Sequence, residues 1–99
     1  METKFTKGPL RVDIAGEPES PLYWYVQQDD NKPFRGTLAS FQSAEHIGGT
    51  TREETLANAL LYAAAPDLYA ALVAVISVAD RKTIEFDAAH AALAKARGE

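Results

Sequence analysis

A short segment in the middle of the 99-residue chain gathers the side chains most able to do covalent chemistry. Ser40, Ser43 and His46 follow one another within seven residues. Nucleophilic catalysis needs a hydroxyl in contact with a base, and a third group that orients the base. Residues three apart in a strand point to opposite faces, and the chain contains no Gly-x-Ser-x-Gly turn. We therefore predict no catalytic residue and no enzyme.

The next segment favours binding over catalysis. It comprises His46, Gly48, Gly49, Thr50, Thr51 and Arg52. Glycines allow a ligand to approach the backbone, and the free N–H groups at a helix start attract anions such as phosphate. The competing interpretation is a turn followed by a helix that Thr51 and Glu54 cap. A small anionic ligand or a nucleotide is one function that this junction allows, although the lysine of a P-loop is missing.

Metal chemistry is not expected. The histidines His46 and His90 have no second histidine three or four residues away, and the chain has no cysteine to supply a thiolate. The sequence thus predicts no metal and no cofactor.

Tyrosines on one strand suggest a surface for protein recognition. In the segment 22–28, Leu22, Trp24 and Val26 alternate with Tyr23 and Tyr25, and alternate residues of a strand share a face. If helices cover the Trp24 side, the tyrosine side faces solvent or a partner. The predicted partner-binding residues are Tyr23, Tyr25, Arg11, Gln27, Asp29 and Asp30. The alternative is that the tyrosines cover the edges of a small core.

Three strands are expected to position these residues. Leu10, Val12 and Ile14 alternate with polar residues, which is typical of a half-buried strand. Turn-forming residues at 16–21 and 29–33 separate it from a second strand at 22–28 and a third at 36–43. Short connections predict an antiparallel meander.

Helices are expected in the second half, which holds fifteen of the eighteen alanines. We predict helices over 52–64, 66–80 and 85–97, because Pro66 disfavours a helical residue before it and Gly98 is a natural stop. The fold class is therefore α+β in a single domain over 1–99, with a meander at about 9–47 and a helical half at 51–97. The second helix is apolar nearly all round, so Leu72, Val73 and Ile76 are predicted to lie in a homo-oligomer interface; the alternative is the central helix of a monomer.

Charge and hydropathy narrow the classes of partner. Ten Lys and Arg against fourteen Asp and Glu give a net charge of −4, which disfavours nucleic acid as the main partner. The longest uncharged apolar stretch, 68–79, is about twelve residues and falls short of the ~20 that span a bilayer. We expect no membrane partner and a cytoplasmic location in the cell that makes the protein.

Two stretches resemble short bacteriophage and prophage proteins. The segment NALLYAAAPDLYAAL at 58–72 is similar to their N-A-x-L-I-A-A-A-P-E-L-L-x-A-L motif, and FTKGPLRV at 5–12 is similar to their opening. The two cover about a quarter of the chain. The resemblance implies a phage context and no particular activity or site residue. Because small accessory phage proteins often occupy a host target, it implies a stoichiometric binder of a host protein, including a counter-defence inhibitor. A ligand-sequestering protein and a self-assembling structural module are the alternatives.

Overall fold

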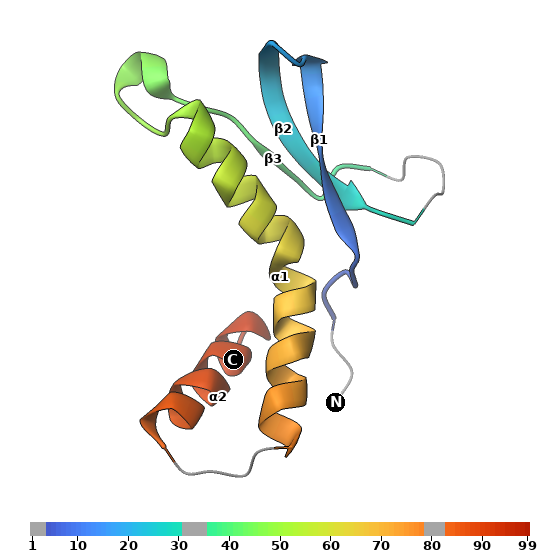
Figure 1. Cartoon of the computed structure of the whole chain (residues 1–99), viewed down its shortest axis with the longest axis vertical. Helices are drawn as coiled ribbons and strands as arrows, with labels where there is room; N and C mark the ends of the chain where they lie inside the picture. Colours follow the sequence, from blue (N-terminus) through green and yellow to red (C-terminus); the bar gives the residue numbers. More distant parts are fainter. Residues whose placement is uncertain (1–3, 31–35, 79–82) are drawn as a thin grey trace.

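A three-stranded antiparallel sheet packs on the first half of a long helix in the computed structural model, which describes residues 4–30, 36–78 and 83–99 (Figure 1). The strands are β1 (Leu10–Glu17), β2 (Ser20–Gln28) and β3 (Ala39–Phe41), in the order β1-β2-β3. A short 3-10 helix, η1 (Glu45–Ile47), precedes α1 (Arg52–Val78) and α2 (Ile84–Ala96). The predicted α+β class and antiparallel meander are confirmed.

The alternation of apolar residues sets the register of the sheet. Val12 lies opposite Val26, and Ile14 lies opposite Trp24, so the apolar residues of both strands share one face. Gly16 follows an irregularity in this pairing and has a φ of 100°, a conformation that only glycine adopts readily. The strands then turn at Pro18 and Glu19. The third strand is shorter than predicted, because only 39–41 pairs with β2.

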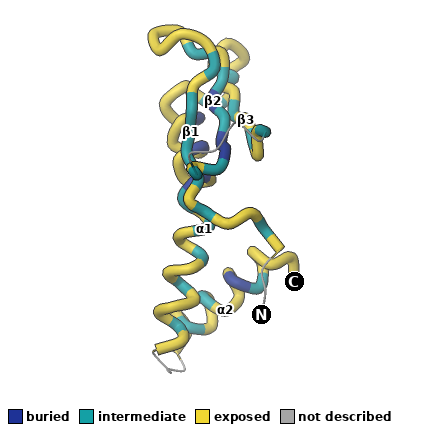
Figure 2. The backbone as a smooth tube through the Cα atoms, turned by 90° about the vertical axis from the view of Figure 1, so that its right-hand side faces the viewer, coloured by how far each residue is buried: buried dark blue, intermediate teal, exposed yellow. Residues whose placement is uncertain are grey.

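The core lies between this face and the first half of α1. Trp24 and Val26 are buried in β2, and Thr55, Ala59 and Ala63 are buried in α1. The three helical residues are four apart, so they form one stripe toward the sheet. Their small side chains allow the helix to approach the strands closely. Figure 2 shows the buried residues concentrated here, while most of the remaining chain is exposed.

The prediction of three helices is wrong, because α1 runs unbroken through Pro66. A proline inside a helix removes one backbone hydrogen bond and costs about 3 kcal/mol. The turns on either side and the N-terminal segment offset that cost. A Cβ built on Gly8 would lie 3.4 Å from Pro66 Cβ, and the Phe5 ring meets the Tyr69 ring edge-on at a centroid distance of 4.9 Å. The N-terminal segment therefore packs across α1 where the sequence predicted a break.

The last helix agrees closely with its prediction. Thr83 caps its start by accepting a hydrogen bond from the Phe86 N–H at 3.2 Å. Gly98, with a φ of 82°, follows its end, and its N–H donates to the Lys95 carbonyl. The predicted turn residues 31–33 and connector residues 80–82 lie outside the residues that the structure describes.

The continuous helix has a consequence for hydropathy. By its length and composition alone, α1 is long and apolar enough to cross a membrane. Its most apolar 18-residue stretch has a mean hydropathy of 1.8, and 11% of that stretch is buried in the structure. The twelve-residue stretch considered from the sequence alone is thus part of a longer apolar helix. Its first half nevertheless packs on the sheet.

Candidate functional site

The face of the sheet that points away from α1 carries most of the predicted partner-binding residues. Arg11 pairs with Gln27, Asp13 with Tyr25, and Ala15 with Tyr23, so these side chains share one face. We call the face formed by Arg11, Asp13, Tyr23, Tyr25, Gln27 and Asp29 the tyrosine face. Tyr23 and Tyr25 are half-buried, and their ring centroids are 6.1 Å apart. The predicted residues thus come together, with Asp30 just beyond the end of β2.

A charged cluster organises one side of the tyrosine face. The Arg11 Nε donates to Asp13 Oδ2 at 2.8 Å, and Arg11 Nη1 lies 3.4 Å from Asp29 Oδ1. The buried Gln27 amide donates to the same Asp13 oxygen at 2.6 Å. The hydrogen bond from Arg11 lowers the pKa of Asp13, with help from Gln27 and against the effect of desolvation. The same hydrogen bond raises the pKa of Arg11.

Sequence reasoning missed Asp13, although it is the centre of this cluster. Its signal was the alternation that places Arg11 and Asp13 on one side of β1. What the sequence does not give is the register, which brings Gln27 and Asp29 of β2 to the same carboxylate. The face offers phenol groups, a guanidinium and carboxylates held in place, which suits hydrogen bonding to another protein.

The glycine junction is organised by contacts within the chain. The Glu45 carboxylate accepts the Arg52 N–H at 2.7 Å, and Thr51 Oγ1 accepts the Glu54 N–H at 3.1 Å. A carboxylate of this chain therefore stands where an anionic ligand would bind a helix start. Gly48 has a φ of 77°, and a Cβ on Gly49 would lie 2.9 Å from Ala44 Cβ. The backbone conformation at Gly48 and the close packing at Gly49 therefore explain why glycine occupies both positions. The ligand site remains a prediction.

The other predicted junction residues are exposed or take part in hydrogen bonds within the chain. His46 is exposed on η1, and Thr50 accepts the Ala44 N–H through its carbonyl at 2.8 Å. The described residues contain no group of three or more His, Asp or Glu side chains able to hold a metal ion.

The predicted oligomer residues divide between two sides of α1. Leu72 and Ile76, one turn apart, are half-buried, and Leu72 lines a groove against α2. Val73 is exposed and points about 100° away from Leu72 around the helix. The structure therefore does not bring the three residues onto one surface.

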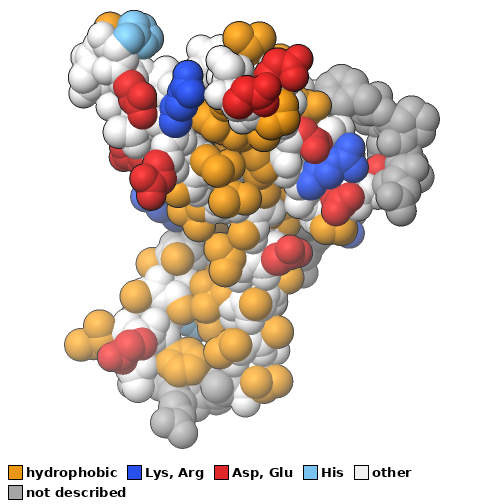
Figure 3. Space-filling model, turned by 45° about the horizontal axis from the view of Figure 1, so that its top comes forward, with side chains coloured by type: hydrophobic (Ala, Val, Ile, Leu, Met, Phe, Trp, Pro, Cys, Tyr) orange, Lys and Arg blue, Asp and Glu red, His pale blue; other side chains and the backbone are white. Residues whose placement is uncertain are grey.

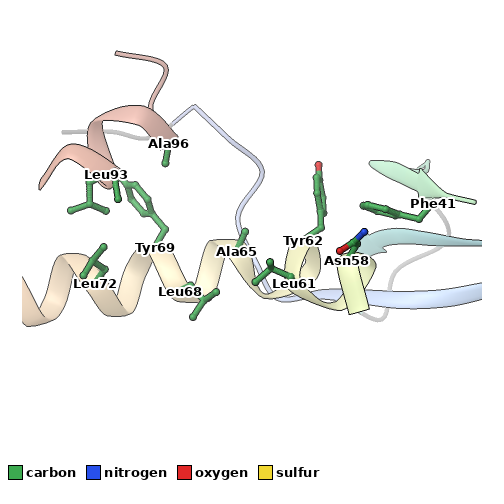
Figure 4. Close-up of a pocket in the computed structure, with 11 residues that line it drawn as sticks. Phe41, Asn58, Leu61, Tyr62, Ala65, Leu68, Tyr69, Leu72, Leu93 and Ala96 are labelled. Carbon is green, nitrogen blue, oxygen red and sulfur yellow. The ribbon is translucent and has the colours of Figure 1, made fainter. Parts of the chain in front are cut away.

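An apolar groove of about 480 Å³, which was not predicted from the sequence, lies between β3, α1 and α2. Tyr69 and Leu72 of α1 lie near Leu93 and Ala96 of α2, and Phe41 and Tyr62 lie together at the other end (Figure 4). The last two rings meet edge-on at a centroid distance of 5.7 Å. The groove forms only because α2 folds back on α1, and that arrangement cannot be seen in the spacing of residues.

A family model of known proteins matches this chain over its whole length. The model is that of Salmonella phage P22 protein Y8K6, and the match covers residues 1–99. The chain belongs to this phage protein family. No curated protein and no solved structure matches it.

Membership of the phage P22 family supports the resemblance to small phage proteins, at the level of the family. The stretch 58–72 that carried the resemblance lies entirely within α1 and contains Pro66 at its centre. It includes Ala59 and Ala63 of the core and Tyr69, which contacts Phe5. In this phage protein the stretch therefore joins the sheet, the N-terminal segment and the groove.

Proposed function

We propose that this phage protein is a non-enzymatic accessory protein that binds a host protein stoichiometrically through its tyrosine face. The observation that carries the proposal is the pair Tyr23–Tyr25, which lies on the sheet face opposite α1 beside the Arg11–Asp13–Asp29 cluster. Tyrosine contributes a large, rigid contact area and a hydroxyl for hydrogen bonds. Such side chains are enriched in the centre of protein interfaces.

The charges on this face indicate the kind of host protein that fits. Among the residues that the structure describes, Asp13 and Asp29 both pair with Arg11. In this described cluster two carboxylates meet one guanidinium, in a chain whose net charge is −4. A partner surface with Lys or Arg around an apolar centre would be complementary. A nucleic acid backbone would be repelled by the same charges.

The phage context favours a host defence protein as the target, and inhibition by occupancy as the mode of action. Inhibition of this kind requires no catalytic group, only an affinity high enough to saturate the target in the bacterial cytoplasm. The family membership supports the phage origin, and the tyrosine face supplies the surface on which the mode of action depends.

The test is a comparison of wild type with the double variant Tyr23→Ala, Tyr25→Ala. Tagged protein is incubated with lysate of the host bacterium, retained proteins are identified, and the main candidate is purified and titrated by calorimetry. We expect one binding event per chain and an affinity reduced at least about 100-fold in the double variant, because two central aromatic residues are removed. Phage plating on a host that carries the target should fall in parallel.

A matched control separates binding from folding. Leu22→Ala removes a large side chain of the same strand that is 73% exposed on the opposite face, so it should bind like wild type. Circular dichroism must show that all variants fold. If the double variant binds the purified target as tightly as wild type, the tyrosine face is not the binding surface and the proposal fails.

A further inference from the structure

An apolar stripe with a regular repeat lies on α1, away from the sheet. It consists of Leu61, Ala64, Leu68, Ala71, Val75 and Val78, which we call the α1 seam. Successive members are three, four, three, four and three residues apart, which is the spacing of a and d positions in a coiled coil. Leu61, Leu68 and Val75 are each more than half exposed. The seam therefore has the pattern of a helix that packs against another helix. Leu61 and Leu68 also line the groove beside α2, but they stay more than half exposed.

The seam lies on the face opposite the core stripe. Its residues point roughly 100–200° around the helix from Ala59, which is fully buried against the sheet. Figure 3 shows apolar side chains along the face of the molecule over α1. No member of the seam carries a charge.

The chain as a whole exposes more surface than a compact monomer of its mass, by an amount that a dimer interface could cover. The chain exposes 7434 Å², whereas a compact monomer of 10.7 kDa exposes about 5,500 Å². The radius of gyration is 16.5 Å, against about 12.6 Å for a compact domain of this length. The excess of roughly 1,900 Å² lies within the ~1,000–2,500 Å² that each chain buries in an obligate homodimer.

We propose that a second copy of this chain packs antiparallel against the α1 seam. In an antiparallel pair an a position of one helix lies beside a d position of the other. One register then pairs Leu61 with Val78, Ala64 with Val75, and Leu68 with Ala71. Each pair occurs twice in the dimer, so every member of the seam has a partner. Leu68 meets alanine in this register, which fills each layer evenly, whereas a parallel pair would set Leu68 against Leu68 and Ala71 against Ala71.

The placement of the sheets agrees with the antiparallel arrangement. Each sheet packs on the first half of its own α1, so antiparallel helices carry the two sheets at opposite ends of the dimer. The helix dipoles also oppose each other, which is the favourable orientation. This arrangement does not use the tyrosine faces, so the dimer does not depend on the function proposed above.

The first measurement is the mass of the full chain in solution by light scattering and sedimentation. We expect a dimer, and at least a 100-fold rise in its dissociation constant for Leu68→Asp, because the substitution places a charge in the apolar centre. Leu22→Asp is the matched control, since Leu22 is equally large and lies exposed on the hairpin; it should remain dimeric. A wild type that is monomeric at high concentration overturns the proposal, and binding of that monomer to lipid vesicles would identify a membrane as the occupant instead.

Single cysteines test the orientation without disturbing the fold. The chain has no native cysteine, so each introduced thiol is unique. We expect a short bismaleimide to join Leu68→Cys to itself, and tagged Leu61→Cys to Val78→Cys in a mixture. Leu61→Cys alone should not react with its own copy, because the two thiols would lie about 26 Å apart along the axis. Efficient self-linking of all three variants would show a parallel dimer and refute the register.

Discussion

The two halves of α1 lie in opposite environments. In the first half, Thr55, Ala59 and Ala63 are buried against the sheet. In the second half the same stripe continues through Ala70 and Ala74, and both are exposed. The difference arises because the sheet ends before the helix does. Apolar composition alone therefore does not decide which face of this helix forms the core; the reach of the strands decides it.

The second half is held by fewer contacts of a different kind. Tyr69 meets the Phe5 ring on one side, and its hydroxyl accepts the Arg97 Nη1 at 3.3 Å. In the described part of α2 only Leu93 is buried. This half depends on aromatic and polar contacts from the two ends of the chain, and it leaves the α1 seam exposed.

The largest expected effect comes from placing the same charge in each half of α1, which tests whether the two halves differ in burial. Ala59→Asp puts a carboxylate at a fully buried position without a partner, which costs roughly 3–5 kcal/mol of unfolding free energy. Ala70→Asp changes an exposed position of the same stripe and should cost no more than about 0.5 kcal/mol. Urea unfolding followed by circular dichroism measures both.

The two variants share their helix propensity, so the difference between them reports burial. Equal losses of unfolding free energy would contradict the view that the halves differ. Retention of the α1 seam's dimer in Ala70→Asp would show in addition that this residue lies outside the interface.

The junction of the halves gives a second test, at Pro66. In a continuous helix Pro66→Ala restores an N–H that can donate to the Tyr62 carbonyl. We expect stabilisation by about 1–2 kcal/mol, less than the full ~3 kcal/mol difference between the residues because the unfolded chain also gains freedom. Thermal unfolding at a fixed protein concentration measures the change.

The opposite result would have a clear meaning. If Pro66 began a new helix, as the sequence suggested, its missing N–H would cost nothing at that position. Pro66→Ala would then be neutral or destabilising, and the two halves would be separate helices.

The sheet was predictable from the sequence because its signals are local. The alternation of Val12 and Ile14 with polar residues identified β1, and the alternation around Trp24 identified β2 and the face that the tyrosines occupy. Turn residues such as Gly16 marked the hairpin. The shortness of β3 was not predictable, because it depends on how many residues reach β2.

The helices show where local rules fail. The preference of Ala65 for a non-helical conformation before Pro66 is weak compared with packing by Gly8 and Phe5, which are distant in sequence. The groove beside Leu93 was missed for the same reason, since it requires α2 to fold back. Asp13 was missed because its role depends on the strand register. The unpredicted features all depend on tertiary contacts.

Acidification tests how much the Arg11–Asp13 pair stabilises the sheet, and it has the smallest expected effect on the free energy of unfolding. The pKa of Asp13 is lowered in the folded chain, mainly by the hydrogen bond from Arg11. The ionised Asp13 side chain therefore contributes its full stabilisation above the ordinary aspartate pKa of about 3.9. This stabilisation is lost as the pH falls through the lowered pKa of Asp13 in the folded chain. Asp13→Asn keeps an oxygen for the Gln27 amide and removes the charge.

We expect Asp13→Asn to lower the unfolding free energy at pH 7 by less than about 1 kcal/mol, because the Asp13 side chain is 35% exposed and solvent screens the pair. The gap between the variant and wild type should close toward pH 2, as measured by urea unfolding at both values. A gap of the same size at both values would mean that the Arg11–Asp13 charge pair does not stabilise the sheet, and that the cluster serves only to orient the tyrosine face. The stability of the sheet would then come from the apolar face that packs against α1, and not from the charged cluster on the tyrosine face.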